Sequence, residues 1–174
     1  MLHSLSGRFL ILTIIFVMLA EVLIFVPSVA RFREDYLLLR LERAQIASLA
    51  LLADEMISPD LEEELLRNAE VFNVVLRRDE ARQLILASPM PQVVDRTYDL
   101  RDPPALELIR DAMAQLWDPA PEVIRVIGNP TREAGLQIEV TMETGPLRTA
   151  MLDYGVRILI LSAVISIFTA TLLF

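Results

Sequence analysis

The side chains in this sequence that are capable of chemistry are mainly carboxylates and arginines. The chain has no cysteine, and its single histidine, His3, precedes the first long apolar segment. Thiolate metal sites, disulfides and Ser-His or Cys-His nucleophile pairs are therefore excluded from the rest of the chain. All 16 basic residues are arginine, which also excludes a P-loop lysine and a Schiff-base lysine. The sequence thus predicts no catalytic residue and no set of zinc ligands.

Acidic side chains are densest shortly after residue 53. Carboxylate oxygens are the ligands that divalent cations such as calcium prefer, so a cation site is one interpretation. Their spacing matches no calcium loop, and acids also gather at helix N-termini because the helix dipole favours them there. Both interpretations remain open for the six residues concerned, which are Asp54, Glu55, Asp60, Glu62, Glu63 and Glu64.

Four arginines lie on or beside predicted strands. A guanidinium fork grips carboxylates and phosphates, so these side chains are candidates for binding an anionic ligand. The alternative is pairing with acids on a neighbouring strand, for example Arg125 with Glu139. The four candidates are Arg77, Arg78, Arg82 and Arg125.

The composition divides the chain into three parts. Apolar residues make up 54% of the 174 residues, and their excess lies in segments 9–30 and 158–174. The middle part, residues 31–157, has the composition of one soluble domain and carries the whole net charge of −8. An acidic domain repels nucleic acid, so no nucleic-acid partner is predicted.

Segment 9–30 predicts a transmembrane helix, since 22 residues suffice for the ~30 Å hydrocarbon core. A cleaved signal peptide is the alternative, because Ser28-Val29-Ala30 resembles a cleavage site, but signal peptides have apolar regions of only ~7–15 residues. Arg8 makes the N-terminal flank weakly positive, which favours a cytoplasmic segment 1–8. The lipid bilayer is thus the first expected partner.

Two residues of this first span are candidates for a role in signalling. Glu21 is its only charged residue, and an ionisable group within a membrane marks a contact or proton site unless a helix bundle merely tolerates it. Pro27 lies one turn before the predicted exit and is expected to kink the helix.

Segment 158–174 predicts a second transmembrane helix, which the sequence leaves truncated at its end. With two spans, residues 31–157 lie on the far side of the membrane, which in a bacterium is the periplasm. Leu147, Met151 and Tyr154 start an apolar register with alternating spacings of four and three residues that continues into this span. A single stiff helix from domain to membrane suits mechanical coupling, although helices also continue out of membranes without any such role.

The pattern of residues 31–157 predicts an α+β domain. A long helix follows the first span, and its residues 44–53 are apolar on nearly every face, so we expect it to be covered on several sides. Two hairpins are predicted, at 71–88 and 122–143, with a helix after Pro103-Pro104 between them. About four antiparallel strands with helical cover are therefore expected.

The arrangement resembles the input half of bacterial sensor histidine kinases, chiefly those of alphaproteobacteria. The resemblance covers SLSGRFLILTIIFVMLAEVLIFVPSVARFREDYL, the domain of about 125 residues and the lead-in PLRTAMLDYGVRIL to the second span. It implies a PAS-like sensor domain, a homodimer and an inner-membrane location. It also implies a HAMP linker and a kinase domain beyond residue 174, with ATP, magnesium and a cytoplasmic response regulator as their partners.

Other functions remain open at this point. The same input region would suit a chemoreceptor or a cyclic-dinucleotide enzyme, and a small membrane protein of a larger complex would show similar spans. For the kinase interpretation, the expected function is to relay a periplasmic stimulus, either a ligand or a protein, through the second span to the kinase.

Overall fold

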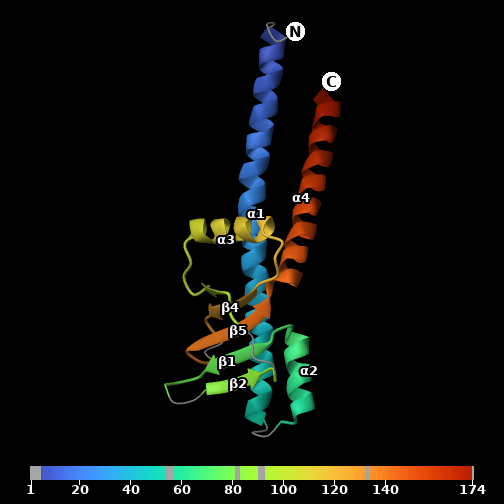
Figure 1. Ribbon diagram of the computed structural model, residues 1–174. Helices are drawn as coiled ribbons and strands as arrows, with labels where there is room; N and C mark the ends of the chain where they lie inside the picture. Colours follow the sequence, from blue (N-terminus) through green and yellow to red (C-terminus); the bar gives the residue numbers. More distant parts are fainter. Residues whose placement is uncertain (1–4, 54–56, 81–82, 90–92, 132–133, 174) are drawn as a thin grey trace.

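A computed structural model of the chain describes residues 5–53, 57–80, 83–89, 93–131 and 134–173. Within these residues it contains helices α1 to α4 and strands β1 to β5 (Figure 1). Their order is α1 (Leu5–Ala53), α2 (Pro59–Ala69), β1 (Asn73–Arg77), β2 (Gln83–Ala87), β3 (Arg96–Asp99), α3 (Ala105–Trp117), β4 (Val123–Gly128), β5 (Gln137–Glu143) and α4 (Thr144–Leu173). The predicted α+β class is confirmed.

The five strands form one mixed sheet in the order β2-β1-β5-β4-β3. Both predicted hairpins are present, because β1 pairs with β2 and β4 pairs with β5 in antiparallel fashion. The expectation of a fully antiparallel sheet of about four strands is wrong, since β3 runs parallel to β4 at the edge. Parallel neighbours need a crossover connection, and α3 supplies it between these two strands.

The first helix is longer than the sequence analysis anticipated. The predicted span and the helix after it form one element of 49 residues, α1, which continues through Pro27. Pro27 has no N–H to donate to the preceding turn, while the next residue, Ser28, donates its hydroxyl proton to the carbonyl of Ile24 at 2.7 Å. Pro27 therefore does not end the helix, and the kink expected there stays a prediction.

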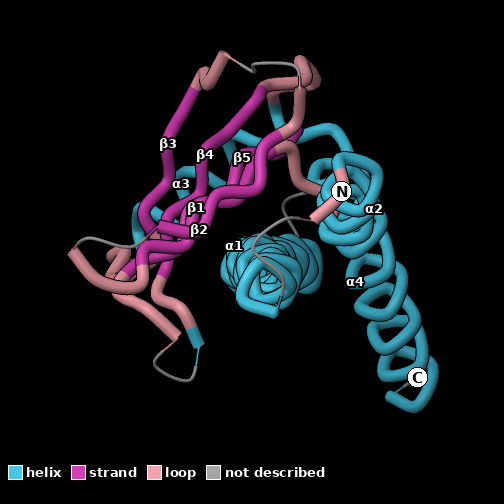
Figure 2. Tube along the Cα trace, turned by 90° about the horizontal axis from the view of Figure 1, so that it is seen from below, coloured by secondary structure: helices cyan, strands magenta, loops and turns pink. Residues whose placement is uncertain are grey.

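The core lies between α1 and one face of the sheet (Figure 2). Leu37, Leu41 and Ala44 of α1 are at most 3% exposed. They pack into one apolar cluster with buried residues of the sheet, which include Val74, Leu76, Ile124, Val126, Ile138 and Val140. A Cβ atom on Gly128 would lie 2.5 Å from Cδ1 of Leu41, so the absence of a side chain lets β4 approach the helix closely.

The expectation that residues 44–53 are covered on several sides is met only in part. Ala44 and Ala47 are buried, whereas Ile46 is 64% and Leu49 40% exposed. Leu38 and Leu39, one to two turns earlier, are also at least 40% exposed. Along one side of α1 four exposed apolar residues, Leu38, Leu39, Ile46 and Leu49, form an apolar stripe that is interrupted by the exposed Glu42 and that the described residues of the chain leave uncovered.

Helix α4 begins at Thr144, directly after β5 ends at Glu143, with no loop between them. Thr144 is buried, its N–H donates to the carbonyl of Glu122, and its hydroxyl accepts from the N–H of Glu122, both at 2.9 Å. The end of β5 and the start of α4 are therefore joined directly, and the first residue of α4 is also held to Glu122.

Helices α1 and α4 are in contact near the sheet and diverge from there (Figure 2), and α1 begins at the end of the molecule where α4 ends (Figure 1). Both are long and apolar enough to cross a membrane, by length and composition. Leu12 and Phe16 of α1, and Ile167 and Phe168 of α4, are at least 65% exposed. Apolar surface of this extent is typical of helices that lie in lipid.

Candidate functional site

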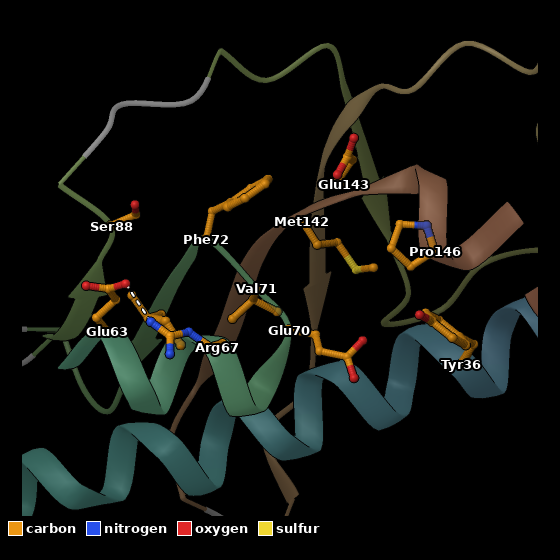
Figure 3. Close-up of a pocket in the computed structure, with 11 residues that line it drawn as sticks. Tyr36, Glu63, Arg67, Glu70, Val71, Phe72, Ser88, Met142, Glu143 and Pro146 are labelled. Atoms are coloured by element: carbon orange, nitrogen blue, oxygen red, sulfur yellow. Dashed lines mark hydrogen bonds and ion pairs between the residues drawn. The ribbon is translucent and has the colours of Figure 1, made fainter. Parts of the chain in front are cut away.

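A cavity of about 420 Å³ lies where α1, α2, β5 and α4 meet, and we call it the junction cavity (Figure 3). Its volume falls in the range of pockets that bind small molecules. The cavity touches both apolar helices, since Tyr36 belongs to α1 and Pro146 to the first turn of α4. Its lining residues are Tyr36, Glu63, Leu66, Arg67, Glu70, Val71, Phe72, Ser88, Met142, Glu143 and Pro146.

Helix α2 and its C-terminal turn form one wall of the junction cavity. Ser58 caps the start of the helix by accepting a hydrogen bond from the N–H of Leu61 at 3.3 Å, as its Ser-Pro-Asp start predicts. At the other end Glu70 adopts the left-handed conformation with φ 55°, and its N–H donates to the carbonyl of Arg67. This turn directs the chain into β1 and brings Glu70, Val71 and Phe72 to the cavity.

Two of the three carboxylates in the lining have arginine partners. Glu63 accepts a hydrogen bond from Arg67 at 2.7 Å. Glu70 pairs with the buried Arg40 and lies 3.7 Å from Arg43. The third, Glu143, is exposed, and its side chain makes no ion pair or hydrogen bond with any other residue that the structure describes. Glu143, at the end of β5, is therefore the one carboxylate of the lining without an arginine partner among the described residues.

Arg40 supports the cavity from behind. Its side chain is only 7% exposed, it donates to the hydroxyl of Tyr36 at 2.7 Å, and its guanidinium lies over the Tyr36 ring at 4.6 Å. Burial by itself lowers the pKa of Arg40, but the hydrogen bonds to Tyr36 and Glu70 outweigh it and hold that pKa above its usual value. Arg40 thus fixes Tyr36 and Glu70 in place as a permanent cation.

A second buried cation, Arg33, lies nearer the apolar parts of the helices. The residue is 1% exposed, and its guanidinium lies 4.4 Å from the centre of the Tyr98 ring. Its Nε and Nη2 atoms have no hydrogen-bond partner among the described residues. Burial lowers the pKa of Arg33 below its usual value, and Tyr98 and Asp111 offset only part of that effect.

The structure does not gather the four candidate arginines into one pocket. In the register of the sheet Arg77 lies opposite Gln137, and Arg125 lies opposite Thr141, four residues further along β5. Arg78 is exposed just after β1, and Arg82 lies outside the described residues. Arg125 is 3.9 Å from Glu139, the cross-strand pairing proposed as the alternative.

The acidic residues after residue 53 also diverge. Among the described residues no group of three or more potential ligands that could hold a metal ion is found. Glu62 accepts a hydrogen bond from the N–H of Ala87, Glu63 pairs with Arg67, and Asp60 and Glu64 are exposed. Asp54 and Glu55 lie outside the described residues.

Three of the residues singled out for signalling, Leu147, Met151 and Tyr154, lie on the packed side of α4. Leu147 and Met151 are fully buried, and the ring of Tyr154 stacks on that of Phe32 with a centroid distance of 4.3 Å. The register proposed for the start of α4 is therefore its packing face. Glu21 is half-buried and Pro27 is exposed.

The fold and the cavity define a class of protein: an α+β domain carried between two helices apolar and long enough to cross a membrane. Comparison of the chain with protein-family models, with curated proteins and with solved structures finds no match.

Sequence reasoning overlooked Tyr36, Arg40, Phe72 and Glu143. A signal for Arg40 was present, because Arg33 and Arg40 are separated by seven residues, on the same side of α1 as Leu37 and Leu41. Arginine at two positions of an otherwise apolar helix side predicts buried cations that need partners. No pattern in the sequence indicated Glu143 as a site residue, because its interest comes only from the cavity beside it.

Proposed function

We propose that this chain is the sensing and transmembrane-signalling region of a bacterial two-component sensor histidine kinase. In this proposal residues 31–157 form a PAS-like periplasmic sensor domain, and α1 and α4 anchor it in the inner membrane. A kinase domain that follows in the full protein uses ATP and magnesium and phosphorylates a cytoplasmic response regulator.

The observation that carries the proposal is that one cavity contacts α1, the end of β5 and the start of α4. A ligand there would bear directly on residues 142–146, which we call the β5–α4 junction. Because α4 follows β5 without a loop, a shift of the junction would move α4 against α1 along the Phe32–Tyr154 contact. Small helix shifts of this kind are an established means of switching.

The sheet supports the PAS-like description in part. Five strands with α1 packed on one face make a small sensor-type domain. The parallel pairing of β3 with β4 departs from the antiparallel sheet that the description implies.

The apolar stripe on α1 supports the homodimer. Two membrane-anchored copies stand parallel, so the same stripe on each copy can meet the other across a two-fold axis. The stripe belongs to α1 itself and continues the helix that carries the first apolar segment. We therefore assign a second copy of this chain to Leu38, Leu39, Ile46 and Leu49.

A cross-linking experiment tests the relay. The chain is fused through α4 to the HAMP linker and kinase domain of a reporter kinase, and Phe32 and Tyr154 are both replaced by cysteine. Because the chain has no other cysteine, a short bis-methanethiosulfonate reagent links α1 to α4 at this contact alone. Cross-linking is expected to change autophosphorylation in membranes about fivefold or more, and reductant should restore the starting rate.

The two single-cysteine variants serve as controls and should not respond to the reagent. A quantitatively cross-linked double variant with unchanged kinase activity would overturn the relay between α1 and α4.

The kinase output has its own test in the gene. The coding sequence beyond residue 174 is expected to encode a HAMP-like helix pair and a helix with a phosphoacceptor histidine. A methyl-accepting helical domain or a cyclic-dinucleotide domain there would replace the kinase with one of the other signalling outputs. A stop codon at that point would overturn every output of this kind in favour of a small subunit of a membrane complex.

A further inference from the structure

The junction cavity has a charge pattern that selects among ligands. Three carboxylates and one guanidinium line it, and the guanidinium of Arg67 is already engaged by Glu63 at 2.7 Å. Arg40 and Arg43, behind the cavity, are both directed at Glu70. With these pairs formed, Glu143 is the one carboxylate of the lining that has no arginine partner among the described residues.

The uncharged part of the lining is apolar and aromatic. Phe72, the residue before β1, lies next to the end of β5, since its N–H donates to the carbonyl of Thr141 at 2.7 Å, and Met142 follows Thr141 in that strand. Val71, Leu66 and Pro146 complete this wall. In Figure 3 Phe72, Met142, Glu143 and Pro146 lie around the same open space. Arg40 already lies over the Tyr36 ring and donates to its hydroxyl, so we assign the aromatic contact of a ligand to Phe72.

We propose that the junction cavity binds a small organic cation with an apolar or aromatic body. Its ammonium group pairs with Glu143 and lies near the Phe72 ring, while its apolar part contacts Met142, Val71 and Pro146. An aromatic ring attracts a cation through its quadrupole, and a carboxylate beside it adds a direct charge interaction. Anions are disfavoured, because no arginine of the lining is left unpaired for them.

This inference rests on the proposed function and deepens it, because it names the class of ligand for the same cavity. Glu143 is the last residue of β5 and precedes the first residue of α4. A cation held there neutralises a carboxylate at the β5–α4 junction itself. Occupancy is thus linked to the covalent connection between the sheet and α4.

Two probes of opposite charge test the ligand class. Benzyltrimethylammonium and benzylsulfonate share a benzyl group and a tetrahedral head group, and differ in the sign of their charge. Each is titrated calorimetrically into the full chain in nanodiscs of zwitterionic lipid, which carry no net charge. We expect saturable binding of one benzyltrimethylammonium per chain and no saturable binding of benzylsulfonate.

Variants assign the binding to the cavity. Glu143→Gln removes the charge at nearly constant shape and should weaken binding of benzyltrimethylammonium at least about tenfold. Phe72→Leu keeps an apolar side chain but removes the ring, and should weaken binding about threefold or more. Glu64→Gln, an equal charge change at an exposed position of α2 outside the lining, should leave the affinity unchanged.

Three results would overturn the assignment: no saturable binding of the cation, equal binding of benzylsulfonate, or an unchanged affinity of the Glu143→Gln variant. The result of the binding experiment can be distinguished from the result of the cross-linking experiment that tests the relay. If the cation fails to bind while cross-linking of α1 to α4 still alters the reporter kinase, the ligand class is wrong and the relay stands. If the cation binds and cross-linking has no effect, the site stands and the relay is wrong.

Discussion

Replacing Leu37 by alanine is expected to lower the free energy of unfolding of the domain by about 2–5 kcal/mol. Leu37 is fully buried at the centre of the contact between α1 and the sheet. Truncation there removes apolar contacts and leaves a cavity between two rigid elements that cannot collapse to fill it. The loss is measurable as the urea midpoint of the full chain in detergent, followed by pulse proteolysis.

Leu38 provides a matched control, being the same residue type one position further along α1. It is 40% exposed and belongs to the apolar stripe. Leu38→Ala should change the stability of the single chain by less than about 0.5 kcal/mol and should weaken self-association in detergent. Equal losses of stability in the two variants would contradict the orientation of α1 on the sheet. Self-association that Leu38→Ala leaves unchanged would contradict the assignment of a second copy to the stripe.

Replacing Arg33 by methionine is expected to stabilise the domain, by about 1–4 kcal/mol. The guanidinium of Arg33 is desolvated by burial, and two of its nitrogen atoms have no hydrogen-bond partner among the described residues. Stacking on Tyr98 and the nearby charge of Asp111 offset part of that cost. Methionine fills a similar volume and requires no partner, so the variant removes the cost of burying the charge.

The pH dependence of the stability gained in the Arg33→Met variant follows from the direction in which the pKa of Arg33 is shifted. Burial lowers the pKa of Arg33, so the folded state binds its proton less tightly than the unfolded state does. The free-energy cost of burying the charged guanidinium is therefore fully present at all pH values below the folded-state pKa. This cost falls only as the pH rises through that pKa. Because guanidinium stays protonated at any ordinary pH, the gain in Arg33→Met should be constant between about pH 6 and pH 9.

Arg31→Met is the control for this prediction. Arg31 lies two residues away on the same helix, its side chain is 70% exposed, and it pairs with Glu34 and Asp35 on the surface. Exposed pairs of this kind contribute at most about 1 kcal/mol, so Arg31→Met should be neutral or slightly destabilising. Destabilisation of Arg33→Met by more than that amount would show that the buried charge stabilises the fold.

Local patterns predicted most of the elements of this fold. The Ser-Pro-Asp start of α2, the alternation along β5 and the one-sided apolar positions of α3 each depend on neighbours in sequence, and each matches the element that the structure contains. Strand β3 was harder to recognise, because its four residues carry no clear alternation. Its pairing with β4 depends on α3, which brings the chain back parallel, and on the stacking of Tyr98 with Arg33.

The candidate site residues show the same difference between features that depend on local sequence and features that depend on distant contacts. The register of Leu147, Met151 and Tyr154 is a property of one helix, so the sequence predicted the packing face of α4. The arginine and carboxylate groupings assumed that residues close in sequence are close in space. In the sheet Arg77 and Arg125 lie on different strands with β5 between them, and the consecutive acids of α2 point to different partners.

The sequence by itself determined two apolar segments, an acidic α+β domain between them and the absence of cysteine and lysine chemistry. These are properties of composition and of short-range periodicity. Only the tertiary structure decided that α4 follows β5 without a loop, that Arg33 and Arg40 are buried, and that Glu143 lines a cavity with Phe72 and has no partner among the described residues. The physical reason is that the segments that bound the junction cavity are far apart in sequence, from residue 36 to residue 146. Whether a charged side chain of this cavity has a partner therefore depends on which distant side chains the packed helices and sheet bring close to it.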